Sequence, residues 1–226
     1  MAGYQLTYNV DMVFCIDSTG SMRHVLDFVK QNALNLYQDI TREMEKKHKT
    51  IHQLRVKVIA FRDYIADGEE AMLSSDFFTL PEQAEMLRDC VEGIHAKGGG
   101  DIPEDGLEAL AYAIRSDWTR EGVKKRHIIV VWSDAPTHEL GHGKIAPWYP
   151  EGMAQDFDEL TLWWKDEQLG GCMDENAKRL LIFAPDAPEW NRISSEWGQV
   201  IHVQTVSEGL EDVEYSQVLD SVCNTI

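Results

Sequence analysis

Oxygen-bearing side chains follow a short apolar segment near the beginning of the chain. Residues 8–16 (YNVDMVFCI) are mostly apolar, and the polar turn DSTGS at residues 17–21 comes directly after them. Because residues two apart in an extended turn point the same way, Asp17, Thr19 and Ser21 can aim one carboxylate and two hydroxyls at a common point. Hard cations prefer such ligands, since Mg²⁺ takes about six oxygens at roughly 2.1 Å and Ca²⁺ accepts more ligands and longer bonds. The turn therefore predicts a divalent-cation site.

Two further loops place acidic side chains beside small residues. A run of three glycines, residues 98–100, precedes Asp101, and Ser133 and Asp134 follow HIIVVW, the most apolar strand-like segment of the chain (residues 127–132). In an open parallel sheet the functional loops lie at the carboxyl ends of the strands. We expect the strand at 127–132 to lie beside the first strand, so that Asp134 completes the site.

These loops need a scaffold of alternating strands and helices. Apolar, β-rich runs predict strands at residues 8–16, 54–61, 127–132, 179–184 and 199–203, with a short edge strand at Phe77 and Phe78. Helical spacing of apolar residues predicts helices at residues 22–47, 81–94, from Pro103 onwards, 152–169, 188–197 and 213–222. Strands separated by helices form right-handed βαβ units. The pattern predicts an α/β fold with a mostly parallel central sheet flanked by helices on both faces.

Residues 14–22 (FCIDSTGSM) resemble the D-x-S/T-x-S metal-ion-dependent adhesion site (MIDAS) of von Willebrand factor type A (vWA) domains. The likeness continues through residues 61–64 (FRDY), through the glycine run before Asp101, and through Asp134 after the long apolar strand. Together these motifs cover nearly the whole chain in the order typical of the family. The resemblance implies a Rossmann-like vWA fold, with residues 1–226 as a single vWA-like domain.

The resemblance also implies a function. The family's site usually binds Mg²⁺ or Mn²⁺ and keeps one coordination position open, which an acidic side chain of a protein partner often fills. Carried over to this chain, Asp17, Thr19 and Ser21 are the ligands of the first loop, and Asp134 is the acid of the third loop, often acting through water. We therefore expect a divalent cation, Mg²⁺ first with Mn²⁺ or Ca²⁺ as alternatives, in a metal-dependent protein–protein interaction module rather than an enzyme.

The second loop departs from the family pattern. Relatives usually contribute a threonine there, whereas this chain has Asp101 at the matching place. As a ligand, Asp101 would bring the carboxylates around the divalent cation to three and the formal charge to about −1, which weakens the attraction of a partner's carboxylate. The other interpretation is that Asp101 caps the helix that begins near Pro103. Both interpretations stay open.

Residues 138–142 (HELGH) match the zinc-peptidase motif H-E-x-x-H literally. In that motif His138 and His142 bind Zn²⁺ from one face of a helix, and Glu139 polarises a water. Pro136 and two neighbouring glycines instead indicate a loop directly after a strand. A zinc-dependent hydrolase with this set is the alternative function. The interpretation we favour is a loop at the rim of the metal site, with one of the histidines available to a partner.

Charge and cysteine content limit the classes of partner and the cellular locations that we expect for this chain. The 226 residues include 39 acidic and 21 basic side chains, a formal net charge of −18. Because this charge repels phosphates and anionic lipids, we expect a protein partner and neither nucleic acid nor a membrane. The four cysteines are far apart, and the chain shows no signal-peptide pattern and no apolar run of the roughly 18 residues that a membrane span needs. These features predict a cytoplasmic location and leave the oligomeric state undetermined.

Two groups of residues keep alternative interpretations. Arg62 and Asp63 either form a structural ion pair that holds their loop or support the metal ligands from behind. Five tryptophans of the last third of the chain either pack helices onto the sheet or offer an aromatic anchor to a partner. They are Trp148, Trp163, Trp164, Trp190 and Trp197.

Overall fold

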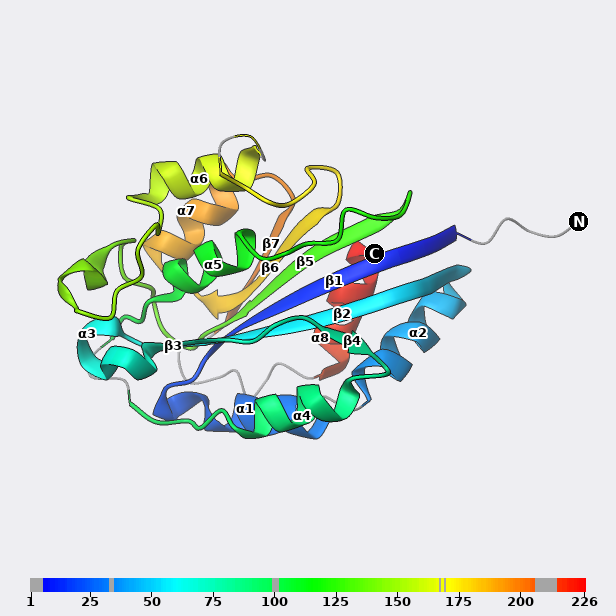
Figure 1. The fold of residues 1–226 in the computed structure, drawn as a ribbon, viewed down its shortest axis with the longest axis horizontal. Coiled ribbons are helices and arrows are strands. Elements are labelled where there is room, and N and C mark those ends of the chain that lie inside the picture. Colours follow the sequence, from blue (N-terminus) through cyan, green and yellow to red (C-terminus); the bar gives the residue numbers. More distant parts are fainter. Residues whose placement is uncertain (1–5, 33–34, 99–101, 167, 169, 206–214) are drawn as a thin grey trace, which may run out of the picture.

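One mixed sheet forms the centre of the molecule, and helices lie against both of its faces (Figure 1). The computed structural model describes residues 6–32, 35–98, 102–166, 168, 170–205 and 215–226. The strands are β1 (Leu6–Asp17), β2 (Lys49–Phe61), β3 (Met72–Ser74), β4 (Phe78–Leu80), β5 (Lys125–Trp132), β6 (Lys178–Pro185) and β7 (Val200–Thr205). The α-helices are α1 (Arg23–Asn32), α2 (Leu36–Lys46), α3 (Tyr64–Asp67), α4 (Ala84–Glu92), α5 (Gly106–Ile114), α6 (Phe157–Lys165), α7 (Pro188–Glu196) and α8 (Tyr215–Thr225). Short 3₁₀ segments are η1 (Gly20–Met22), η2 (Gly68–Ala71) and η3 (His142–Ile145). Within the described ranges, no helix combines the length and the apolar character that crossing a bilayer requires.

The sheet has the order β3-β2-β1-β5-β6-β7, with β4 also paired to β2. The pairs β1/β2, β1/β5, β5/β6 and β6/β7 are parallel, and only the short β3 and β4 run antiparallel to β2. The predicted fold class, an α/β fold with a mostly parallel central sheet flanked by helices on both faces, is confirmed.

Alternate side chains of β1 enter two separate hydrophobic cores. Met12 and Phe14 belong to the core under α1, α2, α4 and α8, whereas Val13 and Cys15 belong to the core under α5, α6 and α7. These four side chains are at most 6% exposed. A strand buried on both faces needs a nearly continuous apolar sequence, which is why the β1 and β5 segments read as apolar runs.

The register of the parallel strands brings their carboxyl ends to one edge of the sheet. Asp17 at the end of β1 stands opposite Phe61 at the end of β2, and Ile16 stands opposite Trp132 at the end of β5. The loops that follow these three strands therefore emerge side by side, next to α3 at the left of Figure 1. This edge carries the candidate site.

Several predicted element bounds need correction. The helix predicted over residues 22–47 corresponds to two helices, α1 ending at Asn32 and α2 beginning at Leu36, and residues 33–34 lie outside the described residues. The helices predicted to begin at Pro81 and Pro103 begin three residues later, at Ala84 and Gly106, and the helix predicted from residue 152 begins at Phe157. Strand β3 was not predicted, since its three residues are too few to show an alternating pattern.

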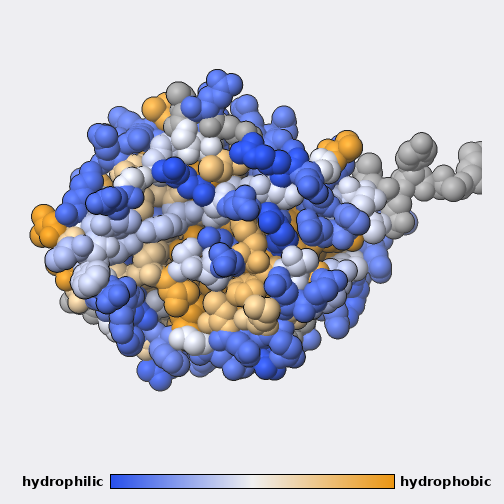
Figure 2. All heavy atoms as spheres, in the orientation of Figure 1, coloured by the Kyte–Doolittle hydropathy of each residue, from blue (hydrophilic) through white to orange (hydrophobic). Residues whose placement is uncertain are grey.

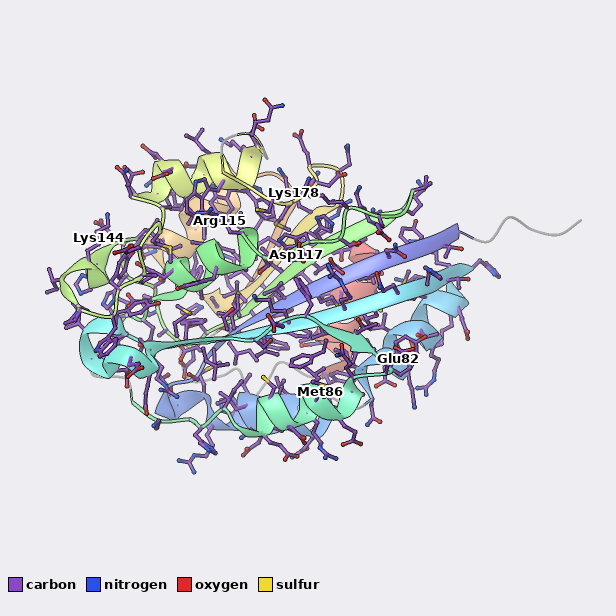
Figure 3. The ribbon with its side chains drawn as sticks, in the orientation of Figure 1. Glu82, Met86, Arg115, Asp117, Lys144 and Lys178 are labelled. Atoms are coloured by element: carbon purple, nitrogen blue, oxygen red, sulfur yellow. The ribbon has the colours of Figure 1, made fainter. Side chains whose placement is uncertain are left out.

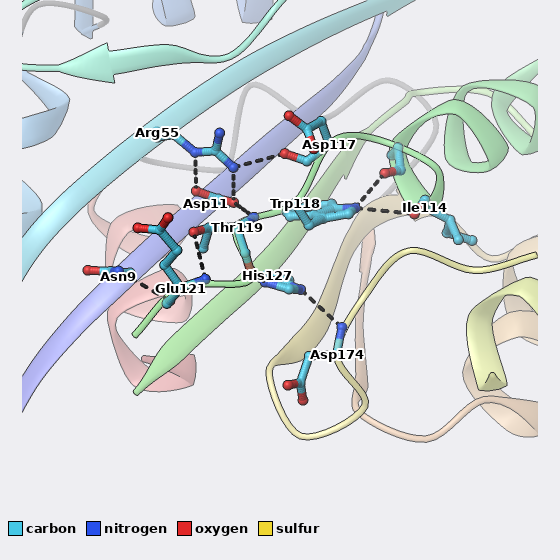
Figure 4. Close-up of polar contacts among 11 residues, drawn as sticks. Asn9, Asp11, Arg55, Ile114, Asp117, Trp118, Thr119, Glu121, His127 and Asp174 are labelled. Carbon is cyan, nitrogen blue, oxygen red and sulfur yellow. Dashed lines mark hydrogen bonds and ion pairs between the residues drawn. The ribbon is translucent and has the colours of Figure 1, made fainter. Parts of the chain in front are cut away.

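A polar network ties the opposite, amino-terminal end of the sheet together (Figure 4). Asp11 of β1 is fully buried, and its carboxylate accepts bonds from Nε and Nη2 of Arg55 on β2 at 2.8 and 2.6 Å. The backbone amide of Thr119 donates to the same carboxylate at 2.6 Å. The hydrogen bond from Arg55 to Asp11 raises the pKa of the guanidinium, so this buried charge is matched by a cation. Asp11 therefore provides a comparison for Asp17, the buried aspartate at the carboxyl end of the same strand.

Candidate functional site

The first predicted loop comes together as the sequence indicated. Asp17 is fully buried, and its Oδ1 accepts bonds from the backbone amide of Thr19 at 3.0 Å and from the Thr19 hydroxyl at 2.6 Å. The Thr19 and Ser21 hydroxyl oxygens are 3.3 Å apart, and Ser21 is exposed to solvent. One carboxylate and two hydroxyls thus form a connected oxygen cluster that begins inside the sheet edge and reaches the surface.

The loop after β5 joins this cluster. The Ser133 hydroxyl donates to Oδ2 of Asp17 at 2.8 Å, so the two loops are bonded directly. The next residue, Asp134, is half-buried, and its carboxylate is close enough to act on the pKa of Asp17. The structure therefore brings Asp17, Thr19, Ser21 and Asp134 to the same edge of the sheet.

Packing against α5 and α7 holds the β5 loop in place. The Trp190 indole, fully buried in α7, donates to the carbonyl of Ala135 at 3.1 Å. The Thr137 hydroxyl accepts the backbone amide of Leu107 at 3.1 Å, which links the loop to the first turn of α5. Asp134 is thus carried on a segment that is bonded on both sides.

The second loop contributes a residue that the sequence analysis missed. Asp101, the predicted second-loop ligand, lies outside the described residues, so neither of its two interpretations is tested. Three residues later, Glu104 is only 3% exposed, and its Oε2 atom has no hydrogen-bond partner among the described residues. Its backbone is tied to the β5 loop, because the Glu104 amide bonds to the Pro136 carbonyl at 3.1 Å. Glu104 is a buried carboxyl group at the site edge, and no Lys or Arg in the described part of the chain forms an ion pair with it.

The site gathers buried carboxyl groups whose pKa values are raised. Burial raises the pKa of Asp17 to about 6, and the nearby Asp134 carboxylate contributes to this rise. The hydrogen bonds from Thr19 and Ser133 lower the pKa but do not offset the effect of burial. Burial also raises the pKa of Glu104 to about 9, with Asp17 the first of four neighbouring carboxylates that contribute. Carboxyl groups in this arrangement either hold protons or require a cation.

Arg62 and Asp63 do not form the ion pair that the sequence suggested as one alternative. The Arg62 guanidinium donates to three backbone carbonyls, those of Ser18 at 3.2 Å, Glu70 at 3.0 Å and His95 at 2.9 Å. Asp63 instead caps α3, and its Oδ1 accepts the Ala66 amide at 3.1 Å. Arg62 therefore braces the backbone of the first loop through Ser18, which is a structural role, and it leaves the carboxylates of the site unneutralised.

The literal H-E-x-x-H match is not assembled as a zinc site. Residues 138–141 lie outside any helix, as the glycines indicated, and η3 begins only at His142. The two imidazole rings stack at 3.9 Å between centroids, and Nδ1 of His138 is bonded to Asp105 at 3.1 Å. His138 is buried and His142 is exposed, so only His142 is available to a partner.

The donor set suits a hard cation. Cis oxygens of an octahedral Mg²⁺ site at roughly 2.1 Å from the metal are about 3 Å apart, and the oxygens of Asp17, Thr19 and Ser21 are already 2.6 and 3.3 Å apart. The buried Glu104 carboxyl lies close enough to Asp17 for the two groups to interact, so it can become a further oxygen donor when it gives up its proton. Among the described residues, no three His, Cys, Asp or Glu side chains are grouped as metal ligands. The fit therefore rests on hydroxyls and carboxylates together.

Sequence comparisons match this chain to parts of two longer proteins. No family model matches the chain. The chain is 27% identical over 138 residues to a putative ariadne-like RING finger protein R811 of Acanthamoeba polyphaga mimivirus. It is 25% identical over 143 residues to the alpha-protein kinase vwkA of Dictyostelium discoideum. These matches cover 60% and 63% of this chain but only 12% and 21% of the two proteins, which are therefore much longer than the matched part.

Comparison with solved structures shows which known folds this chain resembles. The pilus adhesin SpaC of Lactobacillus rhamnosus GG superposes with a TM-score of 0.51 and 10% identity, over 95% of this chain and 30% of the adhesin. The VWA domain of SpRpn10 aligns with a TM-score of 0.47 and 11% identity, over 91% of this chain and 95% of that domain. The adhesin match shows a shared fold, and a VWA domain is among the structural neighbours. Neither comparison shows the metal site.

Proposed function

We propose that this chain is a vWA-type module that binds a divalent cation, Mg²⁺ first, and uses it to hold a protein partner. Asp17, Thr19 and Ser21 would hold the cation directly, and Asp134 would hold it directly or through water. The cation would supply a positive centre at the sheet edge with an open position for an oxygen of the partner. Asp101 stays a candidate second-loop ligand, and a bound cation would favour the ionised form of Glu104.

The observation that carries the proposal is the uncompensated carboxylate of Asp17. It is fully buried, the three groups that donate to it among the described residues are neutral, and the Asp134 carboxylate lies close enough to raise its pKa. Asp11 on the same strand is equally buried and is paired with Arg55. A buried carboxylate without a cation is costly, so a bound divalent ion is the partner that the site lacks.

The comparisons support a binding role. The chain matches only parts of a protein named as a RING finger protein and a protein named as a kinase. A segment that recurs inside larger proteins of different kinds is typical of an accessory interaction module. The partner itself is not identified by these matches.

Metal binding tests the first half of the proposal. Chain stripped with EDTA is titrated with Mn²⁺ and Mg²⁺, and bound Mn²⁺ is followed by electron paramagnetic resonance and calorimetry. We expect one equivalent of metal in the wild type and at least about tenfold weaker binding in Ser21→Ala. The matched control is Ser18→Ala, because the Ser18 hydroxyl donates to the Phe61 carbonyl at 3.2 Å and not to the oxygen cluster.

The same preparations separate the zinc alternative. Elemental analysis of the chain before stripping, with His142→Ala beside the wild type, reports which metal is carried. Stoichiometric zinc that disappears in His142→Ala would contradict the proposal and favour the hydrolase. Equal Mn²⁺ affinity in Ser18→Ala and Ser21→Ala would also contradict it.

A further inference from the structure

A lobe beside the candidate site projects apolar side chains into solvent. This rim lobe consists of residues 64–71, which form α3 and η2, and residues 142–149, which form η3 and the turn after it. Three of its side chains are large, apolar and exposed: Ile65 (46%), Ile145 (82%) and Trp148 (56%). Apolar spheres stand out at the left edge of Figure 2, where Figure 1 shows α3 and the loop after β5.

Trp148 differs from the other tryptophans of the last third of the chain. Trp163, Trp164, Trp190 and Trp197 are all at most 5% exposed, so they pack helices onto the sheet. Trp148 is the member of this group that could serve as an aromatic anchor. Tryptophan is among the residues that most often dominate the energy of protein interfaces.

Packing inside the rim lobe holds the exposed side chains in position. A Cβ added at Gly68 would lie 3.4 Å from Cδ1 of Trp148, so the indole rests on this glycine. A Cβ at Gly143 would lie 2.9 Å from Cβ of Tyr64, which shows how closely η3 approaches α3. The rings of Tyr64 and Tyr149 meet edge to face, 5.3 Å between centroids. The Trp148 ring is therefore placed in advance of binding, which lowers the entropy cost of using it as an anchor.

The surroundings of these apolar side chains are strongly acidic. Residues 62–72 and 134–159 together contain ten Asp and Glu against two Lys and Arg. Two of these acids pair with basic residues from other segments, Glu70 with Lys97 at 2.5 Å and Asp158 with Arg192 at 3.0 Å, and acids still outnumber bases among the rest. The two basic residues are occupied: Arg62 bonds to three backbone carbonyls, and Lys144, labelled on the lobe in Figure 3, bonds to the Gln155 carbonyl at 2.6 Å. Glu69 and Glu139 are exposed acids of this surface. Such a field attracts cationic surfaces and repels acidic ones.

We propose that the rim lobe docks a partner segment in which apolar side chains stand beside Lys or Arg. The apolar side chains would cover Ile65, Ile145 and Trp148, and the basic ones would face the exposed carboxylates. This surface deepens the proposed interaction role by giving the class of partner, and it does not depend on a bound cation. A second copy of the chain is a poor occupant, since it carries the same charge of −18.

Selection from a random-peptide phage library on the immobilised full chain tests the proposal. The selected peptides are then measured by fluorescence anisotropy at low and high salt. We expect them to combine Lys or Arg with Leu, Ile or Phe, and to weaken about tenfold or more on Trp148→Ala and on Ile145→Ser. Glu69→Gln with Glu139→Gln should weaken binding and flatten its salt dependence. Peptides without basic residues would overturn the proposal.

Control variants keep the outcomes distinguishable. Val123, 99% exposed and just before β5, lies near the opposite end of the sheet, so Val123→Ser should leave peptide binding unchanged. Binding that persists in EDTA and in Asp17→Asn but is lost in Ile145→Ser supports the lobe, and the metal proposal is then decided by the metal titrations alone. Binding that is lost in EDTA and unaffected by Ile145→Ser overturns the lobe and leaves the metal proposal standing. Sedimentation that shows a dimer broken by Ile145→Ser would assign the surface to a second copy and overturn the basic partner.

Discussion

The same substitution at two buried aspartates of β1 should change stability in opposite directions. Asp11 and Asp17 are both fully buried on this strand. Asp11 is paired with the Arg55 guanidinium, whereas the groups that donate to Asp17 within the described residues are all neutral. We expect Asp17→Asn to stabilise the metal-free chain at pH 7 and Asp11→Asn to destabilise it.

The magnitude at Asp17 follows from its pKa. A pKa of about 6 in the folded chain, against the ordinary 3.8 of an aspartate, corresponds to about 3 kcal/mol of unfavourable burial of the charged form at pH 7. An asparagine avoids this cost and keeps the two bonds from Thr19. The Ser133 hydroxyl can turn to donate to the Ala135 carbonyl, which is 3.1 Å away, and accept from the new amide. Asp17→Asn should therefore raise the free energy of unfolding by about 1–3 kcal/mol.

The pH dependence has a defined sign. Because the folded pKa of Asp17 lies above the unfolded one, the folded chain binds more protons between about pH 4 and pH 6. The contribution of Asp17 is fully present below pH 4 and is lost as the pH rises through 6. The difference between Asp17→Asn and the wild type should thus be small at pH 4 and reach its full value by pH 7.

Asp11→Asn removes the charge that Arg55 needs. The Arg55 side chain is 19% exposed, so water compensates it only in part, and we expect a loss of about 3 kcal/mol. Urea unfolding in EDTA, followed by tryptophan fluorescence and circular dichroism at several pH values, measures both variants. Adding Mg²⁺ at about one hundred times its dissociation constant should then stabilise the wild type by about 2.7 kcal/mol and leave Asp17→Asn unchanged.

Two results would refute this reasoning. If Asp17→Asn is less stable than the wild type in EDTA at pH 7, the buried carboxylate is not a cost. If the free energies of unfolding of Asp17→Asn and the wild type differ by the same amount at pH 4 and pH 7, the titration of Asp17 does not contribute.

The Mg²⁺ measurement tests the cation site separately. Stabilisation of Asp17→Asn by Mg²⁺ to the same extent as the wild type would show that Asp17 is not a ligand of the cation.

Two further predictions concern packing and thiol chemistry. Gly106→Ala should cost about 1–3 kcal/mol in urea unfolding, because its Cβ would lie 2.7 Å from Cη2 of Trp190, while Gly198→Ala, with nothing within 4 Å, should stay within about 0.5 kcal/mol. Equal effects of the two substitutions would contradict the close approach of α5 to α7. Cys15 should react with iodoacetamide only after unfolding, because burial raises the pKa of its thiol far above the usual range. Mass spectrometry that finds Cys15 labelled in the native chain as fast as the half-buried Cys172 would contradict its burial.

The pattern of consecutive residues was sufficient to predict the main strands and the first loop of the candidate site. The runs ending at Ile16 and Trp132 are apolar because both faces of β1 and β5 are buried, so the pattern sits in consecutive residues. Asp17, Thr19 and Ser21 are neighbours in sequence, and their meeting depends on one turn. The rule that parallel strands share a carboxyl edge then placed Asp134 on the correct side.

Helix beginnings and short strands were harder to predict from the sequence. Pro81 and Pro103 are typical first residues of helices, yet both lie in turns that precede α4 and α5 by three positions. Strand β3 exists because β2 extends far enough to pair with Leu73 and its neighbours. Helix beginnings and short strands depend on contacts with segments that are distant in the sequence, and the pattern of neighbouring residues does not contain this information.

The sequence by itself determined the fold class, the edge of the sheet at which the candidate residues gather, and the oxygen-rich character of the first loop there. Only the tertiary structure decided which charges are compensated there. It buried the Glu104 side chain with Oε2 lacking a hydrogen-bond partner among the described residues, turned Arg62 toward backbone carbonyls, and left Trp148 exposed. The physical reason is that compensation and exposure depend on groups far apart in the chain, brought together by the order of strands β2, β1 and β5.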